Sequence, residues 1–201
     1  LGTGCGVVGL AYLLLKRNIC QGFGMDCNPE LIAAAQNNTA KLGFSDRFAL
    51  HTGELADTRF LENLRMEASP VQLVMANPPW RLVGSGRLPA TEARRKALFG
   101  DKGTFPLFAS AASSLLEEDG RFACIISPDR LQDMLAALDG AGLTPYLLQY
   151  IHKQKTSPAT FVLIEARKGA HAKPSVAEPI ALYGPERFFT LESLAFCPFL
   201  R

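Results

Sequence analysis

The chain has 201 residues, enough for one domain with a hydrophobic core. Apolar residues make up 48% and charged residues 20%, and the formal net charge of +2 excludes a global field that would draw the chain onto nucleic acid or a membrane. The five cysteines occur singly and show no ligand spacing with the three histidines, so we expect no metal site. An odd number of scattered cysteines favours a location in the reducing cytoplasm, where the thiols stay free.

The first six residues, Leu1-Gly2-Thr3-Gly4-Cys5-Gly6, place three glycines at alternate positions before an apolar helix predicted for residues 7–16. Glycines allow a sharp turn and a close approach to a ligand, and the helix behind them offers unpaired N–H groups. A bare tight turn and a nucleotide site both remain open from this pattern alone. No strand stands before the glycines in this sequence, so we expect the first strand of the sheet to be missing from it.

Strands and helices then alternate. Strands are predicted for residues 20–25, 47–51 and 71–76, and helices for residues 29–42 and 55–67. Asn28 is a good N-cap for the first of these helices. After a long basic insertion at 81–103, the pattern predicts helices at 105–118 and 129–138 and strands at 122–127, 143–152, 160–167 and 180–183.

The alternation predicts an α/β fold with a mainly parallel sheet covered on both faces, closed by an antiparallel hairpin of 143–152 and 160–167. We expect a single domain over residues 1–201. Within it, residues 1–76 form a cofactor-binding half, 77–170 a catalytic and substrate half, and 171–201 a linker and tail.

Two acidic residues follow predicted strands. Asp26 follows the strand predicted for residues 20–25, within ~20–25 residues of the glycines, where an acid can accept hydrogen bonds from both ribose hydroxyls of a nucleotide. Glu54, next to Leu55, follows the strand predicted for residues 47–51 and could accept a hydrogen bond from a cofactor adenine amine. A capping role for Asp26 and a solvated loop position for Glu54 stay open. The G-x-G-x-G spacing favours S-adenosylmethionine over NAD, because no third glycine falls at the pyrophosphate position.

Asn77-Pro78-Pro79-Trp80 directly follows the strand predicted for 71–76, at the edge where open α/β sheets bind ligands. The two prolines fix the backbone and remove two donors. Asn77 Oδ1 and the Pro78 carbonyl can then accept hydrogen bonds from both N–H groups of a flat exocyclic amine, which localises its lone pair for attack on a sulfonium methyl. Trp80 offers a stacking face for a base. The alternative is a rigid turn with a core tryptophan.

Three segments carry a family resemblance: residues 1–6, Gly24-Met25-Asp26-Cys27-Asn28-Pro29, and 77–80. They resemble the cofactor and catalytic motifs of amino-methyltransferases with a seven-stranded Rossmann-like class I fold. Further segments resemble the bacterial tRNA1(Val) adenine-N6 methyltransferase family: Gly84-Ser85-Gly86, Ala93-Arg94-Arg95, Gly120-Arg121-Phe122, residues 161–169, and the tail with Tyr183 and 189–192.

The resemblance covers almost the whole chain and implies S-adenosylmethionine as cofactor and the adenine beside the anticodon of tRNA as substrate. It assigns cofactor contacts to Gly2, Thr3, Gly4, Cys5, Gly6, Asp26, Cys27, Glu54, Leu55 and Asn77, and catalysis to Asn77, Pro78, Pro79 and Trp80. The family usually has Tyr where this chain has Trp80, which keeps the stacking face and removes a hydroxyl.

Basic residues of the insertion are predicted to contact RNA phosphates: Arg81, Arg87, Arg94, Arg95, Lys96 and Lys102. His152, Lys153 and Lys155 form a second candidate, whereas Phe188 is expected to pack within the tail. Two alternatives remain: a protein glutamine-N5 methyltransferase acting on release factors, against which the basic insertion argues, and an inactive RNA-binding module, against which Asn77 and Asp26 argue. DNA adenine methylation would need a target-recognition region for which the chain leaves little room.

Overall fold

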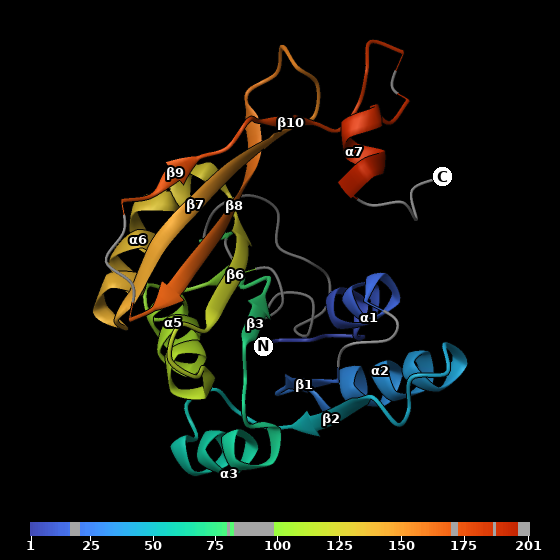
Figure 1. Cartoon of the computed structure of the whole chain (residues 1–201), viewed down its shortest axis with the longest axis vertical. Helices are drawn as coiled ribbons and strands as arrows, with labels where there is room; N and C mark the ends of the chain where they lie inside the picture. The colour runs from blue at the N-terminus through green and yellow to red at the C-terminus, as the bar shows by residue number, and fades with distance from the viewer. Residues whose placement is uncertain (17–20, 80, 83–98, 170–172, 187, 197–201) are drawn as a thin grey trace.

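The structure is a computed structural model that describes residues 1–16, 21–79, 81–82, 99–169, 173–186 and 188–196 (Figure 1). The first half contains α1 (Val7–Leu15), β1 (Gly22–Asp26), α2 (Pro29–Lys41), β2 (Phe48–Thr52), α3 (Thr58–Ala68), β3 (Leu73–Ala76) and β4 (Arg81–Leu82). The second half contains β5 (Phe99–Gly100), α5 (Thr104–Leu115), β6 (Arg121–Ile126), the 3-10 turn Pro128–Arg130, α6 (Leu131–Gly140), β7 (Leu143–His152), β8 (Ala159–Lys168), β9 (Ser175–Val176), β10 (Ile180–Ala181) and α7 (Leu191–Phe196).

The larger sheet has the strand order β10-β7-β8-β6-β3, with β9 also pairing β7. β3 runs parallel to β6, and β7 and β8 form the expected antiparallel hairpin. β1 and β2 pair in parallel as a separate sheet. The mixed α/β architecture with parallel strands is therefore confirmed, whereas the described strands do not join into one seven-stranded sheet.

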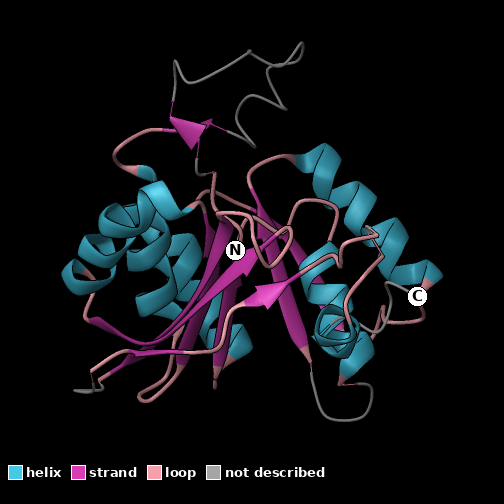
Figure 2. Ribbon diagram, turned by 90° about the horizontal axis from the view of Figure 1, so that it is seen from above, coloured by secondary structure: helices cyan, strands magenta, loops and turns pink. Residues whose placement is uncertain are grey.

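Helices lie on both sides of the strands (Figure 2). The main core joins α5 and α6 to the larger sheet, and fully buried side chains such as Phe105, Phe122 and Met134 fill it. A smaller cluster packs α1 against β2 through Leu10, Leu13 and Phe48. No helix in the described part of the chain has the length and apolar character needed to cross a membrane.

Local capping explains several helix boundaries. The side chain of Asn28 accepts a hydrogen bond from Glu30 N at 2.9 Å, and Pro29 occupies the first helical position, as predicted for α2. α3 begins at Thr58 rather than at residue 55, because the Asp57 side chain caps it by accepting from Phe60 N.

The prediction for residues 105–118 was too long at its carboxyl end. α5 ends at Leu115, because Leu116 turns into an extended conformation that buries its side chain completely. Glu117 N then donates to Val71 O at 3.1 Å instead of continuing the helix. β3 begins at Leu73 rather than at residue 71.

Candidate functional site

The glycine turn adopts the conformation that its composition predicts. Gly2, Gly4 and Gly6 have φ angles of 60°, 54° and 89°, a region that residues with a Cβ rarely occupy. Gly6 N donates to Thr3 O at 2.9 Å, and Gly6 is the N-cap of α1. A side-chain cap is absent at this helix start, and a Cβ placed on Gly4 would meet nothing within 4 Å. The turn therefore presents backbone next to open space.

Asp26 braces this turn with both carboxylate oxygens. Oδ2 accepts from Gly4 N at 2.9 Å, and Oδ1 accepts from Asn28 N at 3.0 Å. Charge-assisted bonds of this kind to backbone N–H groups are stronger than neutral ones. Asp26 is half-buried, and each carboxylate oxygen retains further accepting capacity. The carboxylate therefore fixes the glycine turn and the start of α2 together.

The first three residues connect the two sheets. The Leu1 amino nitrogen donates to Met75 O in β3 at 2.8 Å, and Thr3 N donates to Met25 O in β1 at 2.8 Å. A single segment thus bonds to both strands, which places their carboxyl ends about two strand spacings, or ~10 Å, apart. The ends of β1 and β3 therefore lie at the same edge of the fold.

Asn77 follows β3 directly at this edge, and it is exposed. Pro78 is fully buried and Pro79 is half-buried, so the prolines anchor the segment that carries Asn77. The structure brings Asn77 to the same side as the glycine turn and Asp26, as the motif predicted. Trp80 lies outside the described residues.

The remaining predicted cofactor contacts sit near the carboxyl ends of the smaller sheet. Gly53 N donates to Asp26 O at 3.1 Å, which ties the segment after β2 to the end of β1. Glu54 and Cys27 are exposed and Leu55 is half-buried. Cys5 O accepts from Asn38 Nδ2 at 2.9 Å, so the glycine turn is also held by α2.

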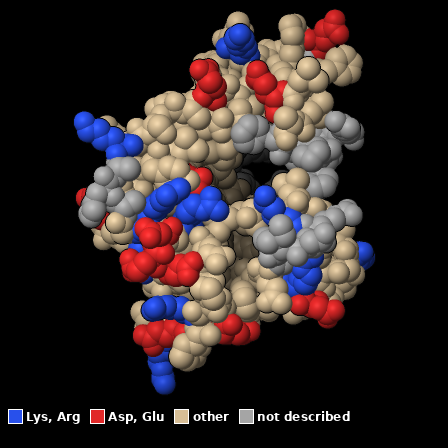
Figure 3. Space-filling view, viewed as in Figure 1, with Lys and Arg blue, Asp and Glu red and all other residues tan. Residues whose placement is uncertain are grey.

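The predicted RNA contacts are only partly placed. Lys102 is exposed immediately before α5, and Arg81 belongs to β4. The other residues of that prediction, Arg87, Arg94, Arg95 and Lys96, lie outside the described residues. On the face in Figure 3, acidic and basic side chains are interspersed.

The second basic candidate occupies the loop between β7 and β8. Lys153 and Lys155 are exposed, whereas His152 is half-buried with Nδ1 2.6 Å from Ser157 O. Because β7 runs parallel to β6 and β3, this loop is at the same edge as Asn77. The expectation for Phe188 was wrong: its side chain is 73% exposed.

A turn that the sequence analysis does not predict lies against the Asn77-Pro78-Pro79 segment. β4 and β5 pair in parallel, with Leu82 opposite Gly100. A Cβ on Gly100 would lie 2.7 Å from Pro79 O and 2.7 Å from Thr104 Oγ1. Asp101 N donates to Thr104 Oγ1 at 2.9 Å, and Gly103 N donates to Asp101 Oδ1 at 2.9 Å. The Asp-x-x-Thr spacing is a signal from which this turn could have been predicted.

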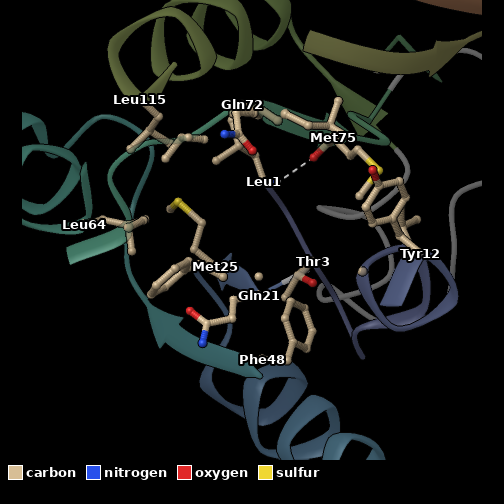
Figure 4. A pocket seen from close by; sticks show the side chains of 18 of the residues that line it. Leu1, Thr3, Tyr12, Gln21, Met25, Phe48, Leu64, Gln72, Met75 and Leu115 are labelled. Atoms are coloured by element: carbon tan, nitrogen blue, oxygen red, sulfur yellow. Dashed lines mark hydrogen bonds between the residues drawn. The ribbon is translucent and has the colours of Figure 1, made fainter. Parts of the chain in front are cut away.

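A cavity of about 800 Å³ extends from this edge into the molecule, between β1 and β3 (Figure 4). Leu1, Gly2, Thr3 and Asn77 line it at the end nearest the site. Burial lowers the pKa of the Leu1 amino group from 8.0 to about 6, an effect that the charge of Asp26 partly offsets. The cavity therefore borders three of the predicted cofactor contacts, Gly2, Thr3 and Asn77, whereas Gly4, Asp26 and Glu54 are not among its lining residues.

Comparison with protein families finds no family model that matches the chain. The chain is 31% identical over 138 residues to the tRNA1(Val) (adenine(37)-N6)-methyltransferases of two strains of Porphyromonas gingivalis. The match covers 67% of this chain and 51% of each relative. The chain therefore spans about half the length of the curated relatives it matches.

Solved structures show the same fold. A structure described as a predicted O-methyltransferase from Agrobacterium tumefaciens superposes with a TM-score of 0.74 at 20% identity, over 100% of this chain and 85% of that one. A putative rRNA methylase from Clostridium thermocellum gives a TM-score of 0.52 at 21% identity, over 81% and 84%. The chain thus has the Rossmann-like fold of S-adenosylmethionine-dependent methyltransferases, and in sequence it is similar to tRNA1(Val) adenine-N6 methyltransferases.

Proposed function

We propose that this chain is the catalytic core of an S-adenosylmethionine-dependent methyltransferase that methylates the exocyclic N6 amine of adenine in tRNA. The observation that carries the proposal is the position of Asn77. It follows β3 at the edge where Asp26 braces the glycine turn. The sequence likeness to tRNA1(Val) (adenine(37)-N6)-methyltransferases supports adenine beside the anticodon as the target.

The glycine turn fits S-adenosylmethionine. Open space beside Gly4 leaves room for a ligand against the backbone, and the start of α1 has no side-chain cap. The positive end of the helix dipole there favours the ligand's carboxylate. The carboxylate oxygens of Asp26 have capacity left for ribose hydroxyls, and exposed Glu54 could accept from the adenine amine. When bound, the cofactor supplies a methyl group on a positively charged sulfur.

The chain's own contribution is positioning. Asn77 Oδ1 and the Pro78 carbonyl each accept a hydrogen bond from one N–H of the adenine amine, which concentrates its lone pair on nitrogen. Because Pro78 is buried, the two acceptor oxygens are already in place before the reaction, and no free energy is needed to order them in the transition state. No strong base is needed for the attack, because the methyl donor already carries its leaving group. The newly methylated amine is acidic and loses one proton to solvent, and the chemistry requires no metal. Trp80 stacks on the base, for roughly 1–3 kcal/mol.

RNA reaches the site from the same edge. The basic residues of the insertion and exposed Lys102 neutralise phosphates. The exposed Lys153 and Lys155 provide a second contact, about three strand spacings or ~14 Å from the end of β3. Phe188 lies next to this loop, because Tyr183 N bonds Lys153 O and Gly184 N bonds Phe188 O, both at 2.8 Å. A tRNA substrate places the reaction in the cytoplasm.

The test is transfer of a labelled methyl group from S-adenosylmethionine to bulk tRNA, with a peptide-chain release factor offered in parallel. The proposal expects label in tRNA, recovered as N6-methyladenosine after nuclease digestion. Label in release factor would favour the glutamine methyltransferase alternative. Binding of tRNA without any transfer, by a preparation that binds the cofactor, would favour an inactive RNA-binding module.

A further inference from the structure

A buried arginine follows the end of β6. Arg130 closes the 3-10 turn Pro128–Arg130, and its backbone N donates to Ser127 O at 3.1 Å. The side chain of Arg130 is only 4% exposed. Arginine is rarely buried to this extent unless it is paired, because removing its charge from water costs free energy. The surroundings of the guanidinium show what this burial achieves.

Two contacts hold the guanidinium of Arg130. Its Nε donates to Asp133 Oδ2 in α6 at 2.6 Å, and its Cζ lies 4.4 Å from the centroid of the Phe105 ring. The side chain of Asp133 is 59% exposed, so the ion pair runs from the core to the surface. A guanidinium is planar and stacks on aromatic faces, and a bond at Nε fixes the orientation of its plane. Arg130 therefore joins the start of α6 to the first turn of α5, the helix beside it in Figure 1.

The 3-10 turn lies at the edge of the sheet where the proposed catalytic segment begins. β3 and β6 pair in parallel, with Ala76 opposite Cys124. Three residues further along the two chains, Pro79 and Ser127 follow at about the same level, because both advance from the paired positions in the same direction. The turn that ends in Arg130 is thus a neighbour of the segment that carries Asn77.

The turn before α5 links Phe105 to the same segment. A Cβ on Gly100 would lie 2.7 Å from Pro79 O and 2.7 Å from Thr104 Oγ1, so Gly100 packs closely against both. Asp101 N donates to Thr104 Oγ1 at 2.9 Å, which ties the turn to the residue that precedes Phe105. Because these contacts are continuous, a shift of Phe105 moves the residues that pack against Pro79.

We propose that Arg130 is a positioning residue for methyl transfer. Its guanidinium holds the first turn of α5 through the Phe105 ring, and that turn in turn fixes the Asn77-Pro78-Pro79 segment. The inference rests on the proposed function, in which Asn77 and the Pro78 carbonyl bind the target amine. An apolar side chain of similar volume could fill the place of Arg130 at little cost in stability, since replacing a buried ion by an apolar residue is often neutral. A flexible apolar chain would not supply the fixed orientation.

Arg130→Met tests this role, because methionine is flexible and fills a similar volume, and because water can solvate the exposed carboxylate of Asp133. Denaturant unfolding should show stability close to that of the unaltered chain, and calorimetry an unchanged affinity for S-adenosylmethionine. The kcat for transfer to tRNA should fall about fivefold or more. On a scale of about a hundredfold per ångström, this corresponds to a displacement of roughly a third of an ångström. Amide hydrogens in a peptide spanning residues 99–107 should exchange about fivefold faster or more, with no change in β7.

Arg167→Met is the matched control. The Cζ of Arg167 also lies 4.4 Å from a ring centroid, that of Tyr146, but Arg167 pairs with Arg121 at the opposite edge of the sheet. The control should alter neither kcat nor exchange in residues 99–107. Phe105→Leu keeps an apolar side chain and removes the ring face, so it should lower kcat as Arg130→Met does. The double variant should lose little more than either single variant, because both act through one contact.

Unchanged kcat or unchanged exchange in Arg130→Met would overturn the inference, and so would a loss of activity that matches the fraction of unfolded protein. An equal loss in Arg167→Met would also overturn it, as would independent, multiplying effects of the substitutions at Arg130 and Phe105. If Arg130→Met does not fold, Arg130→Lys replaces it with the same outcomes, since lysine keeps the charge beside Asp133 and lacks the flat guanidinium. Absence of transfer by the unaltered chain would count against the proposed function, and amide exchange would then decide the role of Arg130 alone.

Discussion

Substitution of Gly100 by Ala tests whether the turn after β5 positions the catalytic segment. The added Cβ would lie 2.7 Å from Pro79 O and 2.7 Å from Thr104 Oγ1, distances that real Cβ atoms essentially never show. The Pro79 oxygen belongs to the backbone of a segment stiffened by two prolines, so it cannot move aside as the end of a flexible side chain would. The contact can relax only if the two segments separate by about 0.7 Å, the difference between 2.7 Å and an ordinary contact of about 3.4 Å.

The magnitude follows from what this displacement does. Overpacking of a well-packed site costs about 1–3 kcal/mol of stability. A 1 Å misplacement of a reacting group can cost about a hundredfold in rate, so a shift of about 0.7 Å should lower kcat about tenfold or more. The KM for S-adenosylmethionine should change little, because Gly4 and Asp26 are held by a separate set of hydrogen bonds. Steady-state kinetics with tRNA and a thermal unfolding curve measure both effects.

Gly103→Ala is the matched control, since it lies in the same turn at the start of α5. Its φ is −82°, and its added Cβ would come no closer than 3.4 Å to Asp101 Oδ1, an ordinary contact. The control should keep near-normal turnover and stability. Full kcat in Gly100→Ala would refute the positioning argument, and so would an equal loss in both variants.

Asn77→Ala should abolish methyl transfer while calorimetry shows nearly unchanged cofactor affinity, because Asn77 acts on the amine; near-normal turnover would contradict its role. Asp26→Ala should weaken cofactor binding at least tenfold and lower the free energy of unfolding by about 1.5–3 kcal/mol, because the amides of Gly4 and Asn28 lose a charged acceptor; unaltered affinity by calorimetry would rule the role out. In the folded chain with a free amine at Leu1, the pKa of that amine is lowered to about 6. The unfolded state therefore binds more protons than the folded state between pH 6 and 8, so the free energy of unfolding should rise with pH across that window by at most about 2–3 kcal/mol. Denaturant unfolding at pH 6 and at pH 8 measures this rise, and acetylation of the amine should remove it.

Features set by neighbouring residues could be predicted from the sequence. Alternate glycines before an apolar run, an aspartate at a strand end and an Asn-Pro pair before a helix each specify local backbone, and the structure shows all three. The long hairpin of β7 and β8 was also predicted nearly to its ends, because Ser157-Pro158 interrupts two apolar runs. The proposed substrate comes from the family likeness alone, because no local pattern in the sequence specifies it.

Features that depend on distant partners could not be predicted. The end of α5 is set by a bond between Glu117 and Val71, which are 46 positions apart. The close approach of Gly100 to Pro79 arises only when β4 and β5 pair. The division of the strands into two sheets likewise depends on which strand edges pair, and hydrophobic periodicity does not specify the pairing partners.

The pairing of β4 with β5 has a consequence for how specificity can change. Arg81 lies opposite Phe99 and Leu82 opposite Gly100, so the entry and exit of residues 83–98 are held together beside the Asn-Pro-Pro segment. Lengthening a segment whose ends are already clamped costs little free energy, since closure entropy grows only with the logarithm of its length. Under the proposed function, evolution or a protein engineer can therefore exchange this stretch to suit a different substrate and leave the Asn-Pro-Pro segment unchanged.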